Sequence, residues 1–225
     1  MIRISNISLP IDGDWEQLRK KAAKILGVRP GQLERMTLAR QSVDARNKSQ
    51  LHYVYTVDVT MKHEEQIVRQ ASGKNVSLHQ WPEYIFPEVK RHSALMPVVV
   101  GMGPAGLFAA LYLARAGIPC VILERGQDVD TRSADVEHFW ESGALNPSSN
   151  VQFGEGGAGT FSDGKLNTLV KDKFLRNTKV LEEFVLHGAP EEILYQSKPH
   201  IGTDKLRNVI INMRNKIIDM GGTFL

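Results

Sequence analysis

The sequence contains a single cysteine, Cys120, among its 225 residues. This excludes a disulfide bond within the chain and also a redox-active Cys-x-x-Cys pair. Cys120 stands at the start of an apolar run, where a small buried residue is the default interpretation. No apolar run approaches membrane-span length, and no signal peptide opens the chain. We therefore expect no membrane contact and a cytoplasmic location.

The sequence also shows no histidines at the spacing of metal ligands and no strong net charge. His52 and His63 are too isolated to propose a metal, and we interpret them as surface or partly buried side chains. The net charge of +3 is too small to indicate nucleic acid by itself. The charge is unevenly distributed along the chain. Residues 1–95 carry 15 Lys/Arg against 10 Asp/Glu (+5), and residues 96–225 carry 13 Lys/Arg against 15 Asp/Glu (−2). We interpret the excess as a solvated basic surface rather than a nucleic-acid site.

Residues 1–80 have the pattern of a small α+β domain. Its elements are an alternating strand over 2–9, an amphipathic helix over 15–26, strands over 33–43 and 51–61, a short helix over 64–70 and a last strand over 76–79. Asp14 is the expected N-cap of the first helix, and Gly27 ends it. The order strand, helix, strand, strand, helix, strand predicts a ferredoxin-like plait, a fold that does not define a function. Arg40 and residues 44–46, around the central hairpin, could bind an acidic group, although an exposed turn is the simpler interpretation.

Residues 81–95 carry two prolines and show no clear period, which predicts a linker. Its apolar residues could lie on a neighbouring domain; they are Trp81, Tyr84, Ile85 and Phe86. A second domain is expected over 96–225.

This second domain opens with a strand–turn–helix–strand pattern. The apolar run 98–100 is followed by Gly101, Gly103 and Gly106 at the spacing G-x-G-x-x-G, and an apolar helix pattern comes next. Gly101 would allow a tight turn, Gly103 the approach of a pyrophosphate to the backbone, and Gly106 close packing of the helix on the strand. Free N–H groups at the start of the helix would then face the phosphates. The alternative is that these glycines only pack a helix on a sheet.

An acidic residue, Glu124, closes the second apolar run, 23 positions after Gly101. Its carboxylate can accept hydrogen bonds from ribose hydroxyls, and it would repel the 2′-phosphate of NADP. Arg125 follows directly and is a further candidate ligand. Arg132 falls in the first turn of a helix expected over 128–142, where it could reach a phosphate.

A second glycine-rich stretch covers residues 151–168. The backbone there must either approach a ligand or adopt positive φ angles. A flexible loop is the alternative, but the apolar Phe161 and Leu166 favour a folded one. Helices over 173–187 and 203–220, and the opening of a strand at 223–225, are expected next. The five glycines of the stretch are Gly154, Gly156, Gly157, Gly159 and Gly164.

Three segments, VVVGMGPAGLFAALYLARAG, VILERG and FGEGGAGTFSDGKLNT, together resemble the FAD-dependent enzymes described as NAD(FAD)-utilizing dehydrogenases, of the glutathione-reductase-like flavoprotein class. The resemblance includes a Ser-x-Asp-Ala-Arg turn, here Ser42 to Arg46. It implies that Glu124 binds the adenosine ribose of FAD and that residues 156–160, Gly156, Gly157, Ala158, Gly159 and Thr160, lie beside the ribityl chain or the isoalloxazine. The residues that it places along the pyrophosphate are Gly101, Gly103, Pro104, Ala105 and Gly106.

The resemblance also implies a longer protein, with further strands of the FAD domain and a substrate domain. A doubly wound sheet needs about five or six strands, and only two and the start of a third are recognisable after residue 96. We therefore expect an α/β chain whose Rossmann-like FAD-binding domain is incomplete at its C-terminus, and which is inactive by itself.

The leading interpretation is the N-terminal part of an FAD-dependent oxidoreductase, with NAD(P)H as a candidate electron donor and an undefined substrate. The alternative is a flavin-dependent RNA-modifying enzyme or an RNA-binding module, for which Tyr53 and Tyr55 would be the stacking residues. No catalytic residue can be named. Ser162, Asp163 and Lys165 are the polar residues expected nearest the flavin, and Lys165 is a candidate cation for its N1 side or for the pyrophosphate.

Overall fold

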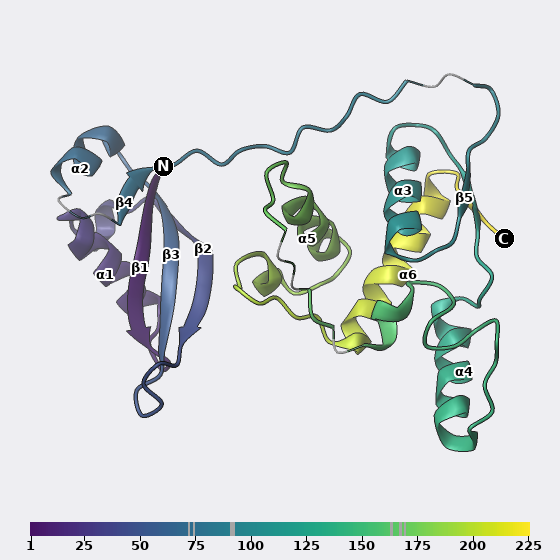
Figure 1. The fold of residues 1–225 in the computed structure, drawn as a ribbon. Helices are drawn as coiled ribbons and strands as arrows, with labels where there is room; N and C mark the ends of the chain where they lie inside the picture. Colours follow the sequence, from purple (N-terminus) through teal and green to yellow (C-terminus); the bar gives the residue numbers. More distant parts are fainter. Residues whose placement is uncertain (72, 74, 91–92, 163, 167, 169) are drawn as a thin grey trace. The chain divides into compact units, whose positions relative to one another are not determined.

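A computed structural model of the chain describes residues 1–225 except 72, 74, 91, 92, 163, 167 and 169. The described chain divides into two compact units, and both mix helices with strands (Figure 1). The first unit comprises residues 1–84, 172–178 and 191–199, and the second comprises residues 85–171, 179–190 and 200–225. Short segments of the second half of the sequence therefore belong to the first unit.

The first unit contains a four-stranded antiparallel sheet with strand order β2-β3-β1-β4. Two helices, α1 and α2, join its strands (Figure 1). Along the chain the elements are β1 (Ile2–Pro10), α1 (Trp15–Leu26), β2 (Arg35–Asp44), β3 (His52–Thr60), α2 (Glu64–Gln70) and β4 (Val76–Leu78), with a short 3₁₀ turn at Pro30–Gln32.

Helix α1 begins and ends where the sequence predicts. The Asp14 side chain accepts a hydrogen bond from the Gln17 N–H at 2.7 Å, and Gly27 takes the left-handed conformation at φ +69°. The buried face of α1 packs on strands β1 and β3. That face consists of Leu18, Ala22, Ala23 and Leu26, so it is rotated away from Trp15 and Ile25, which are exposed.

Tyr53 and Tyr55 belong to the core of the first unit. Tyr55 is buried, Tyr53 is half-buried and packs against the same core, and the two rings lie 5.9 Å apart. RNA recognition on a sheet needs exposed aromatic faces on which bases can stack. Because Tyr55 is buried, the two rings cannot both stack on bases.

The hairpin turn after β2 pairs its charges internally. The guanidinium of Arg46 contacts both carboxylate oxygens of Asp44, with Nε 2.9 Å from Oδ1. These hydrogen bonds lower the pKa of Asp44 to about 2. Two of the three charged side chains of the predicted acidic-group site, Asp44 and Arg46, are therefore already engaged with each other.

Residues 191–199 cover part of the outer edge of β2. After the 3₁₀ turn η3 (Glu191–Leu194), the Gln41 N–H donates to the Tyr195 carbonyl at 2.7 Å, and the Ser197 N–H donates to the Gln41 carbonyl at 2.9 Å. Arg40 Nε also donates to Ser197 Oγ at 2.9 Å. Ile193 in the same segment is buried. Edge strands expose unpaired backbone groups, and this segment satisfies some of them.

The second unit contains a parallel sheet with strand order β5-β6-β7. Helix α3 follows β5 and packs against α6 (Figure 1). The elements are β5 (Val98–Val100), α3 (Pro104–Arg115), β6 (Val121–Leu123), α4 (Val129–Ser142), η2 (Ala158–Phe161), α6 (Thr203–Asp219) and β7 (Thr223–Phe224). Helix α5 (Arg176–Leu186) also belongs to this unit from residue 179 onward.

Small and branched apolar side chains fill the interior of this unit. Ala110 and Leu111 of α3 are fully buried, as are Ile122 of β6 and Met213 of α6. Cys120 is also fully buried, as predicted, and burial raises the pKa of its thiol.

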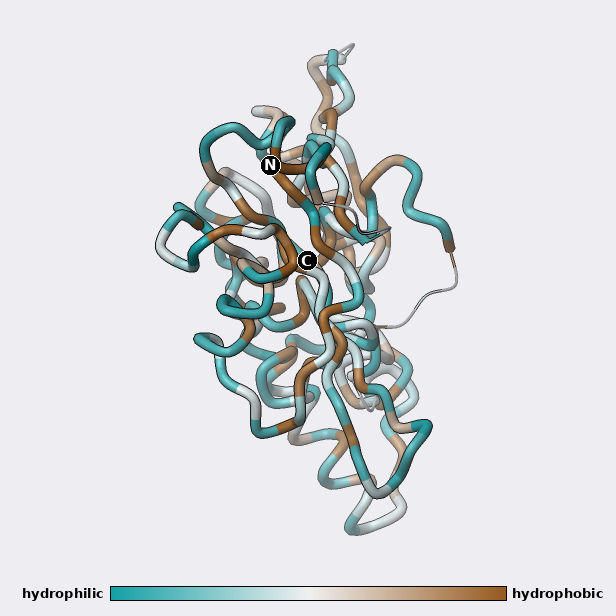
Figure 2. The backbone as a smooth tube through the Cα atoms, turned by 90° about the vertical axis from the view of Figure 1, so that its left-hand side faces the viewer, coloured by the Kyte–Doolittle hydropathy of each residue, from teal (hydrophilic) through white to brown (hydrophobic). Residues whose placement is uncertain are grey.

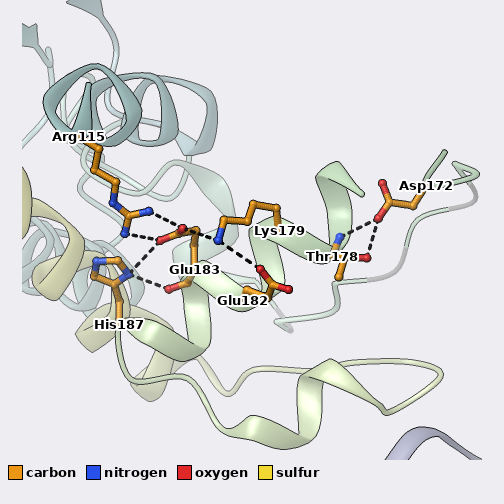
Figure 3. Close-up of polar contacts among 7 residues, drawn as sticks. All are labelled: Arg115, Asp172, Thr178, Lys179, Glu182, Glu183 and His187. Atoms are coloured by element: carbon orange, nitrogen blue, oxygen red, sulfur yellow. Dashed lines mark hydrogen bonds and ion pairs between the residues drawn. The ribbon is translucent and has the colours of Figure 1, made fainter. Parts of the chain in front are cut away.

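A buried carboxylate joins α5 to the end of α3. Glu183 accepts hydrogen bonds from the Arg115 guanidinium on both carboxylate oxygens, and Lys179 Nζ lies 3.3 Å from Oε1 (Figure 3). His187 lies one turn further along the chain, and its ring nitrogen Nδ1 is 2.7 Å from the Glu183 carbonyl oxygen. The start of α5 is capped separately, by Asp172, which accepts from the Thr178 N–H and hydroxyl at 2.8 Å (Figure 3).

Apolar stretches are short throughout the chain. Hydrophobic and hydrophilic segments alternate along the backbone in Figure 2. Within the residues that the structure describes, no helix is both long and apolar enough to cross a membrane.

Candidate dinucleotide site

The turn between β5 and α3 leaves the start of a helix open. Gly101 adopts φ +90°, and its N–H donates to the Leu123 carbonyl of the neighbouring strand at 2.7 Å. Helix α3 has Gly103 as its N-cap, with no capping side chain, and begins at Pro104. The N–H groups of Ala105 and Gly106 lie in the first helical turn, where no intrahelical carbonyl can pair with them. Together with the helix dipole they form a site for an anion.

The fold requires a glycine at position 106 but leaves open space at position 103. A Cβ on Gly106 would lie 1.9 Å from the Gly101 carbonyl oxygen, so the fold itself needs this glycine. A Cβ on Gly103 would meet no heavy atom within 4 Å, and the residue has an ordinary φ of −71°. The space beside Gly103 is therefore open for a group that approaches the backbone.

Glu124 is held at the end of β6 by backbone donors from both sides. Its Oε2 accepts from the Met102 N–H at 2.6 Å and its Oε1 accepts from the Gly126 N–H at 2.9 Å. Each carboxylate oxygen has a second lone pair, so the group can still accept from a ribose hydroxyl. Glu124 thus fixes the glycine turn and remains able to bind a ligand.

The second glycine-rich stretch packs directly on the first. The Gly156 N–H donates to the Met102 carbonyl at 2.8 Å, and a Cβ on Gly157 would lie 3.1 Å from Pro104 Cδ. A Cβ on Gly126 would lie 2.4 Å from the Cα of Gly154. The sequence indicates two separate glycine segments, and the structure brings them together at the start of α3.

Positive φ angles explain most of the glycines in this stretch. Gly154, Gly156, Gly157 and Gly164 have φ of +118°, +84°, +70° and +68°. A side chain would strain the backbone at each of these positions. The described part of the stretch is thus a folded loop, and it includes η2, which contains Ala158, Gly159 and Thr160 of the predicted ligand set.

Arg132 is fully buried beneath this loop. Burial lowers the pKa of its guanidinium, and the charges of Glu124 and Glu155 oppose that shift. The predicted contact of Arg132 with a phosphate stays a prediction, whereas its bonds to the loop are defined. Nε donates to the Asn150 carbonyl at 2.8 Å, Nη2 to that of Val151 at 3.0 Å, and Nη1 to those of Gly154, Glu155 and Gly157 at 3.3, 2.6 and 2.9 Å.

Phe161 lies against two guanidinium groups. Arg132 Cζ lies 4.7 Å from the ring centroid and Arg207 Cζ of α6 lies 4.8 Å from it, both within cation–π range. In the described part of the chain, Nε of Arg207 is buried without a hydrogen-bond partner. The sequence predicts only that Arg207 lies in the helix expected over 203–220. Phe161 and Arg207 are 46 positions apart in the sequence, and no local pattern would have paired them.

A buried acid, Glu155, was also missed. Its Oε2 accepts from the Val129 N–H at 2.7 Å and pairs with Arg214 of α6. Burial raises the pKa of Glu155, against the hydrogen bond from Val129 and the charge of Arg214. Its Oε1, and Oγ1 of the buried Thr160, have no hydrogen-bond partner within the described residues.

The remaining predicted ligands lie around these two loops. The Arg125 guanidinium stacks on the Phe153 ring at 3.8 Å. Lys165 pairs with His200 through its backbone, as an isolated antiparallel bridge. Ser162 Oγ donates to the Gly159 carbonyl at 3.0 Å, and Asp163 lies outside the described residues. No cluster of metal-ligating side chains occurs in the part of the chain that the structure describes.

Two family models match separate parts of the chain, one in the first unit and one in the second. A domain of unknown function (DUF8436) matches residues 1–60, and an FAD binding domain matches residues 95–137. An uncharacterized protein of Clostridium beijerinckii is 45% identical over 224 residues, which is 98% of this chain and 41% of that relative. The chain thus spans about two fifths of the length of this relative. The second match, which includes the glycine turn, α3, β6 and Glu124, supports an FAD-binding domain in the second unit.

Proposed function

We propose that this chain is the FAD-binding N-terminal part of a flavin-dependent oxidoreductase. The observation that carries the proposal is the combination of three features at one end of the sheet in the second unit. They are the uncapped start of α3, the open space beside Gly103 and the carboxylate of Glu124. The match of residues 95–137 to an FAD binding domain points the same way.

The residues at this site fit FAD in charge and shape. The N–H groups of Ala105 and Gly106 would bind the pyrophosphate, and Glu124 would accept from the adenosine ribose. The loop at residues 156–160 would then lie along the ribityl chain or the isoalloxazine. The hydroxyl of Thr160, which has no hydrogen-bond partner among the described residues, suits this position, because a buried hydroxyl without a partner is costly.

When bound, FAD would supply the hydride and electron transfer, and the chain would bind and orient it. Glu124 disfavours NADP at this site, since a carboxylate repels a 2′-phosphate. NAD(P)H as electron donor, the glutathione-reductase-like class and a Rossmann-like domain over 96–225 are parts of the same proposal. For residues 1–80 we propose a ferredoxin-like plait, which the order β2-β3-β1-β4 supports.

The test is flavin binding by the full-length protein and by its Gly103→Val variant. The Cβ of a valine at Gly103 would meet no heavy atom within 4 Å, so we expect the variant to fold like the wild type and lose FAD. Gly31→Val is the matched control, because Gly31 also has an ordinary φ and open space around it. Flavin absorbance after reconstitution measures binding, and circular dichroism measures folding.

Two results would overturn the proposal. One is a folded wild-type protein that takes up no flavin. The other is a Gly103→Val variant that binds FAD as tightly as the Gly31→Val control does.

A further inference from the structure

The first unit contains a cavity of about 380 Å³, remote in sequence from the glycine turns. Strand β2 contributes residues 41–43, β3 contributes Tyr53, and the segment at 191–199 contributes residues 196–198. All of these residues belong to the first unit. The volume lies within the range that small-molecule sites occupy, about 300–1,000 Å³.

Backbone pairing fixes the two walls of this cavity relative to each other. Gln41 exchanges hydrogen bonds with the segment in both directions, to the Tyr195 carbonyl and from the Ser197 N–H. Arg40 fixes the Ser197 hydroxyl through Nε at 2.9 Å. Side chains about 155 positions apart in the sequence are thereby held on opposite sides of one cavity. Because the walls are already fixed, a ligand does not lose binding free energy to ordering them.

The lining has a distinct chemical character. Gln41 and Gln196 offer amides, Tyr53 and Val43 offer apolar surface, and none of the lining residues carries a carboxylate. Lys198 supplies a positive charge and forms no ion pair with any residue that the structure describes. The first unit is basic as well, since residues 1–84, 172–178 and 191–199 together carry 16 Lys/Arg against 12 Asp/Glu, a net charge of +4. A positive field of this kind attracts anions.

We propose that this cavity binds a small organic anion. Its charged group, a carboxylate or a phosphate, pairs with Lys198, and its planar apolar body lies against Tyr53 and Val43. The amides of Gln41 and Gln196 bind polar substituents on that body. This site is independent of the proposed FAD site, because the two have no residue in common.

Three probes that share a phenyl ring test the proposal on the full-length protein with FAD in excess. Benzoate carries a carboxylate, phenyl phosphate carries a phosphate, and benzamide is the neutral counterpart of benzoate. We expect at least one anionic probe to bind ten-fold or more tightly than benzamide in calorimetric or ligand-observed NMR titrations. Whether benzoate or phenyl phosphate binds more tightly identifies the charged group.

Variants assign the binding to this cavity. Lys198→Gln and Gln196→Glu should each weaken the anion ten-fold or more, and Lys198→Arg should retain it. Lys62→Gln, at an exposed lysine of the same unit, makes the same change in net charge and should have no effect. Equal binding of benzamide, binding of none of the three probes, or an unchanged affinity in Lys198→Gln would each overturn the proposal. Flavin uptake is measured separately in every variant, so that failure of the protein to bind FAD can be distinguished from failure of this cavity to bind the anion.

Discussion

At the scale of single residues, Glu124 has a structural role in the glycine turn, and we propose that it also binds the adenosine ribose. Its two oxygens already accept from Met102 and Gly126, so replacement by glutamine removes the charge and turns one acceptor into a donor. We expect Glu124→Gln to weaken FAD binding by about 1–3 kcal/mol, the range of hydrogen bonds to charged groups. Fluorescence titration of the flavin measures this change. Glu141→Gln, on an exposed part of α4, is the control, and equal affinities in the two variants would remove Glu124 from the site.

Arg132 is the residue whose loss should most disturb the loop at 150–157. A lysine in its place keeps the charge but cannot reach five carbonyls with one ammonium group. Buried acceptors left unpaired cost about 1–3 kcal/mol each, so we expect Arg132→Lys to lower the free energy of unfolding by about 3 kcal/mol or more. Urea denaturation measures it, with the exposed Arg69→Lys as the control. An unchanged midpoint would show that the loop does not depend on this guanidinium.

At the scale of elements, Glu183 determines how strongly α5 is held to the end of α3. Burial by itself raises the pKa of Glu183, but hydrogen bonds and charge from Arg115, with the charge of Lys179, outweigh it and lower the pKa. A lowered folded-state pKa stabilises the protein above the unfolded value of about 4.5, and this contribution is lost as the pH falls below it. The attachment of α5 should therefore weaken in acid.

We expect Glu183→Gln to cost about 3 kcal/mol at pH 7, because it breaks a buried ion pair. The cost should shrink as the pH falls below 4.5, since the wild type loses the same contribution there. The neighbouring Glu182→Gln is the control, because Glu182 is half exposed and, within the part of the chain that the structure describes, forms an ion pair only with Lys179 (Figure 3). Denaturant unfolding between pH 3 and pH 7 compares the variants. A pH-independent cost of Glu183→Gln would contradict the assigned ion pair.

Local sequence patterns predict the helices, strands and turns well, but they predict the tertiary contacts between these elements poorly. Asp14, Gly27 and the G-x-G-x-x-G spacing act within a few residues, so the limits of α1 and the turn before α3 follow from the sequence. The rotation of the buried face of α1 and the pairing of Phe161 with Arg207 depend on tertiary packing, which no local period records. The same holds for the association of residues 191–199 with β2.

At the scale of the whole molecule, the segment at 191–199 makes the first unit depend on the second half of the sequence. Ile193 is buried, and the Gln41 N–H, bonded to Tyr195, reports whether the segment is in place. Ile193→Ala should destabilise the first unit by about 2–5 kcal/mol and speed hydrogen exchange at Gln41. Leu194→Ala, at a neighbouring residue that is 44% exposed, is the matched control.

The same exchange experiment shows whether the two units unfold independently. FAD at 100 times its Kd should stabilise the unit that binds it by about 2.7 kcal/mol. If the units unfold separately, FAD slows hydrogen exchange at residues 101–106 and 156–160 and leaves exchange at Gln41 unchanged. Ile193→Ala then speeds exchange at Gln41 and leaves residues 101–106 and 156–160 unchanged. If Ile193→Ala instead speeds exchange equally at Gln41 and at residues 101–106 and 156–160, the two units unfold as one cooperative unit. The segment at 191–199 would then couple the cofactor site to the sheet of the first unit.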